Sequence, residues 1–109
     1  MDFRNFLDRH HDAIVREWKR RLRSEVSPRY TGRPATEYDQ TINAAFGAYF
    51  NALVLNDYSR IDEVVQEIGK FRFEAGFTLS EVQKAFEMFK YLVIPLVVKE
   101  MAGSAPETI

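Results

Sequence analysis

The stretch that most constrains the fold is FEAGFTLSEVQ, because it encodes the end of one helix and the start of the next. Gly76 suits the left-handed backbone conformation that commonly follows the last turn of a helix. Thr78 and Glu81 have the spacing of a capping box, in which each residue satisfies the backbone N–H of the other. Phe77 and Val82 occupy the two positions of a hydrophobic staple around that cap. These signals together predict a tight corner between two helices.

Apolar residues recur at intervals of three and four positions along most of the chain, as they do on the buried face of an α-helix. A first helix is predicted over residues 3–26. Trp18 lies on its apolar stripe with Ile14 and Leu22, so we expect Trp18 in the core. A second helix is predicted to begin near Thr36, whose side chain can act as its N-cap.

Turn-forming segments separate the remaining helices. SPRYTGRPA, with two prolines and a glycine, ends the first helix, and NDYS separates the second from the third. Gly69 lies inside the third helix, where it either permits close packing or is tolerated at a cost. A long fourth helix is predicted over Leu79–Met101, with a kink at Pro95, which cannot donate to the carbonyl of Tyr91. The fold class is therefore all-α: a four-helix bundle-like domain with antiparallel neighbours joined by short turns.

Length and composition describe one small domain. The 109 residues suffice for a single core, which we place in residues 1–102, with 103–109 as a polar tail or the start of a linker. The chain has no cysteine, which excludes disulfides and thiolate metal sites. Its N-terminus lacks the apolar region of a secretory signal, and its longest apolar run, residues 91–98, is too short to cross a membrane. We expect a cytoplasmic protein with no membrane insertion.

The fourth helix is apolar on two sides in its second half. Tyr91, Ile94 and Val98 lie opposite the broad apolar face of the helix, which begins at Leu79 and ends at Val97. Such a helix is either central in its own domain or shared with a partner. These three residues are our candidate dimer interface, and the two alternatives stay open on sequence grounds.

Residue chemistry gives no support for catalysis. His10 and His11 are adjacent, so they point about 100° apart on a helix and do not share a metal-binding face. The chain contains no nucleophile motif and no phosphate-binding glycine loop, so we expect no enzyme activity, no metal and no cofactor. REWKRRLR is basic, but the chain after residue 33 has eleven acidic and six basic residues, so nucleic acid is not an expected partner. The fifteen aromatic residues fit either a ligand pocket or a bundle core.

The segment around the corner resembles a known family. FRFEAGFTLSEVQKAFEMFKYLVIPLV is similar to the N-terminal domain of RsbRD-type regulators, relatives of the RsbT co-antagonist, and the resemblance extends over most of residues 10–100. The matching features are the corner and the amphipathic helix after it: Arg72, Gly76, Leu79, Glu81, Val82, Phe86 and Phe89.

This resemblance implies a non-enzymatic sensory or regulatory module that is often dimeric. In that family the helical unit lies upstream of an output domain, which is a STAS domain in stress-signalling regulators or a histidine kinase in related architectures. We therefore expect a homodimer and an output domain as partners, and this chain as the N-terminal piece of a longer bacterial signalling protein. The alternative is a stand-alone helical protein that binds a small apolar ligand or a protein partner.

Overall fold

The computed structural model describes residues 2–104, and within them the regular structure is entirely helical. The long helices are α1 (Phe3–Arg21), α2 (Ala35–Leu55), α3 (Ser59–Glu74) and α4 (Leu79–Ser104). Two short elements join α1 to α2: the π-helix η1 (Leu22–Val26) and the 3₁₀ helix η2 (Pro28–Gly32). The all-α, four-helix prediction is therefore confirmed. The residues of the predicted tail beyond Ser104 lie outside the described part of the chain.

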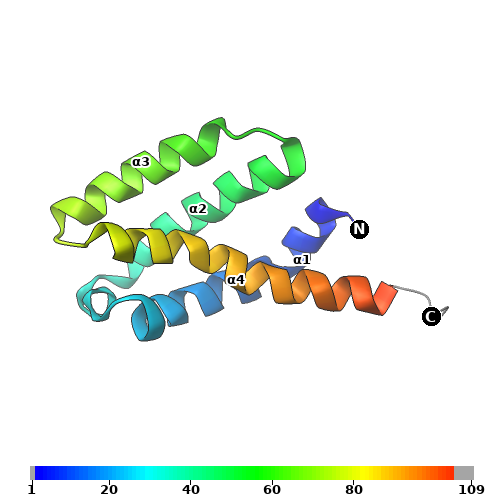
Figure 1. Ribbon diagram of the computed structural model, residues 1–109, viewed down its shortest axis with the longest axis horizontal. Helices are drawn as coiled ribbons and strands as arrows, with labels where there is room; N and C mark the ends of the chain where they lie inside the picture. Colours follow the sequence, from blue (N-terminus) through cyan, green and yellow to red (C-terminus); the bar gives the residue numbers. More distant parts are fainter. Residues whose placement is uncertain (1, 105–109) are drawn as a thin grey trace.

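The helices form two pairs, α2 with α3 and α1 with α4 (Figure 1). Figure 1 shows α2 and α3 as an antiparallel hairpin, with α4 running in front of α1. The corner between α3 and α4 lies at the same end of the molecule as the connection between α1 and α2, whereas the start of α1 and the end of α4 lie at the opposite end (Figure 1). The corner therefore sits where four elements of the chain converge.

Aromatic side chains build the centre of the core. The rings of Tyr49 and Phe89 are stacked, 4.2 Å apart and 2° from parallel, and Trp18 and Phe46 pack around them. The polar tips of two of these side chains are satisfied by the backbone of α4. The Trp18 Nε1–H donates to the Ala85 carbonyl at 2.9 Å, and the Tyr49 hydroxyl donates to the Phe86 carbonyl at 3.2 Å. Trp18 is thus a core residue, as the sequence predicts.

Three local predictions were wrong or incomplete. The first helix ends in π geometry, since the Ser27 N–H reaches back five residues to the Leu22 carbonyl, a change that apolar periodicity does not report. Thr36 is not an N-cap, because α2 already begins at Ala35, after an extended Pro34. Leu79, expected on the buried face of α4, is 68% exposed, since the staple residues Phe77 and Val82 fill the interior beside the cap.

Candidate functional site: a polar helix corner and an exposed apolar face of α4

The end of α3 is closed by the two hydrogen bonds of a Schellman motif. Gly76 has a φ of +92°, a value that glycine adopts without strain. The Phe77 N–H donates to the Arg72 carbonyl at 3.0 Å, and the Gly76 N–H donates to the Phe73 carbonyl at 3.0 Å. The last carbonyls of α3 are therefore satisfied within the corner itself.

The start of α4 carries both hydrogen bonds of the predicted capping box. The Thr78 N–H donates to the Glu81 carboxylate at 2.8 Å, and the Glu81 N–H donates to Thr78 Oγ1 at 3.2 Å. Phe77 and Val82, the staple residues on either side of this cap, are both buried. With α3 closed on one side and α4 capped on the other, the corner leaves little freedom in the angle between the two helices.

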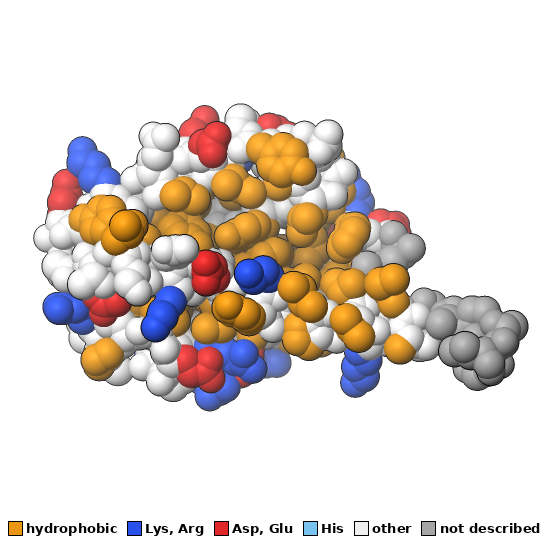
Figure 2. Space-filling model, viewed as in Figure 1, with side chains coloured by type: hydrophobic (Ala, Val, Ile, Leu, Met, Phe, Trp, Pro, Cys, Tyr) orange, Lys and Arg blue, Asp and Glu red, His pale blue; other side chains and the backbone are white. Residues whose placement is uncertain are grey.

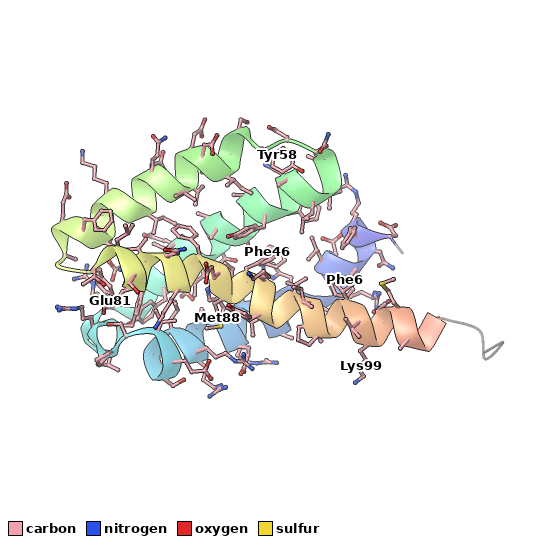
Figure 3. The ribbon with its side chains drawn as sticks, viewed as in Figure 1. Phe6, Phe46, Tyr58, Glu81, Met88 and Lys99 are labelled. Carbon is pink, nitrogen blue, oxygen red and sulfur yellow. The ribbon has the colours of Figure 1, made fainter. Side chains whose placement is uncertain are left out.

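Glu81 also ties the corner to the connection between α1 and α2. The Ser27 hydroxyl donates to the Glu81 carboxylate, and Arg29 Nε lies 3.4 Å from the same group. The Ser27 hydrogen bond is the main reason why the pKa of Glu81 lies below its ordinary value. Figure 3 places Glu81 at the start of α4, facing this connection. One carboxylate therefore joins the cap of α4 to the segment that follows α1.

Arg72 is buried at the end of α3, with only 2% of its surface exposed. Its guanidinium group lies over the rings of Tyr30, Phe77 and Phe71, 5.1–5.4 Å from their centres. Its Nη1 atom lies 3.0 Å from the Glu37 carboxylate. Cation–π contacts of this kind are strongest where water is excluded, so Arg72 holds together α3, α2, η2 and the corner.

Glu37 lies between two arginines. Arg33 donates two hydrogen bonds to the Glu37 carboxylate, at 2.8 Å from Nε and at 2.7 Å from Nη2. The Arg33 hydrogen bonds, with a smaller contribution from the charge of Arg72, hold the pKa of Glu37 below its ordinary value. Sequence reasoning missed this residue, although its spacing of four from Arg33 is that of a helical ion pair. Nothing in the sequence singles out Ser27 as the partner of Glu81, or Tyr30 as the partner of Arg72.

The predicted interface residues on α4 face solvent. Tyr91, Ile94 and Val98 are all more than half exposed, so they do not belong to the core of a single chain. Met101, which sequence reasoning missed, extends the row. The four residues follow one another at spacings of three, four and three, which is the a/d pattern of a coiled-coil seam. We call this row the α4 seam.

An apolar groove borders the α4 seam and shares Ile94 and Val98 with it. Its volume is about 300 Å³, and it lies between the start of α1, the end of α2 and the second half of α4. Its walls include Phe3, Leu53, Val93 and Val97, and Lys90 stands at its edge. Figure 2 shows hydrophobic side chains in a continuous band along α4 and toward α2. Apolar surface of this extent on a small protein is typical of a binding face.

The histidines are packed against aromatic rings. His10 contacts Phe6 and His11 contacts Phe46, with ring centres 4.7 Å apart in both cases. Among residues 2–104, no three histidine or carboxylate side chains come together in a way that could hold a metal ion. Over the same residues, none of the helices has the length and apolarity needed to cross a membrane.

Comparison with known protein families gives a match. The family model described as RsbT co-antagonist protein rsbRD N-terminal domain matches residues 12–109. Comparisons with curated proteins and with solved structures found no match. The match includes both the corner and the α4 seam.

Proposed function

The chain belongs to the family of RsbT co-antagonist protein rsbRD N-terminal domains, and on this basis we propose that it is the regulatory input domain of a bacterial stress-signalling protein. It acts in the cytoplasm and carries out no chemistry of its own. Its output is a domain attached after α4, of the STAS or histidine kinase class. The observation that supports a signalling role most directly is the α4 seam, an apolar surface on the helix that leads toward that attachment point.

We propose that two copies associate through their α4 seams. A helix exposing an a/d row stabilises itself by burying that row against the same row of a second helix. In a parallel pair, the two copies of Ile94 face each other, as do the two copies of Val98. The C-terminal ends of the two α4 helices then lie side by side, so a change in their packing changes the relative position of the two attached output domains.

Light scattering of the purified chain tests this proposal. The wild type is expected at twice the chain mass of 12.7 kDa, and Ile94→Glu at the single-chain mass, because the charge would be buried in the seam. Leu79→Glu is the matched control, since it also places a charge on an exposed apolar position of α4 but lies outside the seam.

The control should remain a dimer, and the far-ultraviolet circular dichroism of both variants should match that of the wild type. A monomeric wild type, or a dimeric Ile94→Glu variant, contradicts the proposal. If Ile94→Glu is unfolded, Tyr91→Glu, which replaces another exposed side chain of the seam, repeats the test.

The groove supports a second candidate function, the binding of a small apolar ligand. Its volume of about 300 Å³ lies at the lower end of the range for ligand pockets. Val97→Phe would fill the groove, so it should reduce the binding of a fluorescent apolar probe, 1-anilinonaphthalene-8-sulfonate. Equal probe binding by the wild type and the variant would exclude the groove as the ligand site.

A further inference from the structure

A cluster of two arginines and one glutamate lies beside the corner, so its positive charges outnumber its negative charge. Arg72 is 98% buried, and its ionic partner is Glu37, whose carboxylate is already gripped by the two aligned hydrogen bonds of Arg33. Two guanidinium groups thus share one carboxylate, so the cluster of Arg33, Glu37 and Arg72 carries one excess positive charge, which water solvates only in part, through Arg33, whose side chain is 30% exposed. A buried charge of this kind is costly unless a partner of opposite sign compensates it.

Part of the hydrogen-bonding capacity of Arg72 is also unused. Its Nε and Nη1 atoms make no aligned hydrogen bond within the described part of the chain, and its Nη2 reaches Thr41 Oγ1 only at 3.4 Å. The proximity of Nη1 to Glu37 is therefore an electrostatic contact without good hydrogen-bond geometry. Leaving buried donors unsatisfied destabilises a fold, and more so when they carry charge. One more hydrogen-bond acceptor beside the guanidinium group would satisfy these donors.

A small crevice lies where that acceptor would be needed. Its volume is about 30 Å³, and Arg72, Tyr30 and Thr41 contribute its polar wall. The remaining wall is apolar and includes Trp18 and Phe86. One water molecule needs about 10–15 Å³ of space measured in this way, so the crevice has room for one compact ion or for about two water molecules.

We propose that this crevice binds one compact monovalent anion of the halide class, with chloride as the natural occupant. The anion supplies the missing negative charge and accepts from the free N–H groups of Arg72. A water molecule would satisfy the donors but would leave the charge uncompensated. Because Arg72 joins α3, α2, η2 and the corner, the bound anion stabilises the junction from which α4 departs.

Thermal unfolding at matched ionic strength tests the proposal. A ligand that binds only the folded state stabilises it in proportion to the logarithm of its concentration above the dissociation constant. The melting temperature should therefore rise with added sodium chloride or bromide, and should stay constant when sodium gluconate, whose anion is too large for the crevice, replaces them. Equal stabilisation by all three salts would mean ionic screening alone and would overturn the proposal.

Two variants locate the effect. Arg72→Met removes the buried charge and should abolish the difference between chloride and gluconate. Arg29→Met makes the same substitution at an exposed arginine of the corner and should preserve that difference. If Arg72→Met does not fold, the anomalous scattering of bromide in crystals of the wild type decides the matter. A bromide peak beside the Arg72 guanidinium is expected, and a water molecule there in its place would refute the proposal.

Discussion

Replacement of Gly76 or Gly69 by alanine should change the stability of the fold in opposite directions. Gly76 has a φ of +92°, whereas Gly69 lies within α3. Leaving aside its chain neighbours and the backbone of its own helix, a Cβ atom built on Gly69 has no atom within 4 Å. Leaving aside its chain neighbours, one built on Gly76 meets Arg29 Nη1 at 3.8 Å. Neither alanine would therefore clash, and the difference between the two variants comes from the backbone alone.

The magnitudes follow from the two conformations. An L-residue in a left-handed conformation costs about 1–2 kcal/mol, so Gly76→Ala should destabilise the fold by that amount. Alanine in a helix interior is favoured over glycine by about 0.5–1 kcal/mol, so Gly69→Ala should stabilise the fold. For a domain of this size, each kcal/mol shifts the melting temperature by about 4–8 °C.

Urea denaturation followed by circular dichroism measures both variants. The midpoints should move in opposite directions while the slope of the transition stays the same, since neither change alters the surface exposed on unfolding. A Gly76→Ala variant as stable as the wild type would refute the Schellman assignment. A destabilised Gly69→Ala variant would show that α3 needs a close approach at this glycine, which the structure does not contain.

Two further predictions concern the carboxylates around the corner. Thr78→Ala should lower the stability by about 1 kcal/mol in urea denaturation, because the Glu81 N–H loses its acceptor; an unchanged midpoint would contradict the cap. The pKa of Glu37 is lower in the folded chain than its ordinary value of 4.5, mainly through the Arg33 hydrogen bonds, so its ionised form stabilises the fold above pH 4.5. That contribution is lost as the pH falls through the lower folded pKa, so the stability difference between wild type and Glu37→Gln should shrink between pH 7 and pH 3. A difference independent of pH would refute this linkage.

Local sequence signals predict much of the fold. The corner is encoded by neighbouring residues, since its glycine, cap and staple positions are all set within a few positions of one another. Trp18 is likewise predictable, because its place on an apolar stripe depends only on helical periodicity. These features appear in the folded structure because the tertiary contacts favour the same conformation as the local sequence.

The contacts of the candidate site were harder to predict. Glu81 and Ser27 are 54 positions apart, and Arg72 and Thr41 are 31 apart, so no local pattern indicates that they meet. Leu79 shows the opposite problem: periodicity places it on the buried face, but its position in the first turn leaves it exposed. The exposure of Tyr91 and its neighbours also depends on how α4 lies across α1, which is a property of the packed molecule.

Most of the hydrogen bonds that hold α4 to the other elements lie near its start, so its second half is held less firmly. The side-chain and backbone bonds of α4 to the connection after α1, to Trp18 and to Tyr49 all fall within residues 81–86. Buried side chains of α4 continue to Val93. From Val93 to Ser104 the helix extends for ~16 Å at 1.5 Å per residue, so a tilt of about 10° there displaces the far end by ~3 Å. The ion pair between Arg9 and Glu100 links that end to α1, so breaking this pair would let the end of α4 move away from α1.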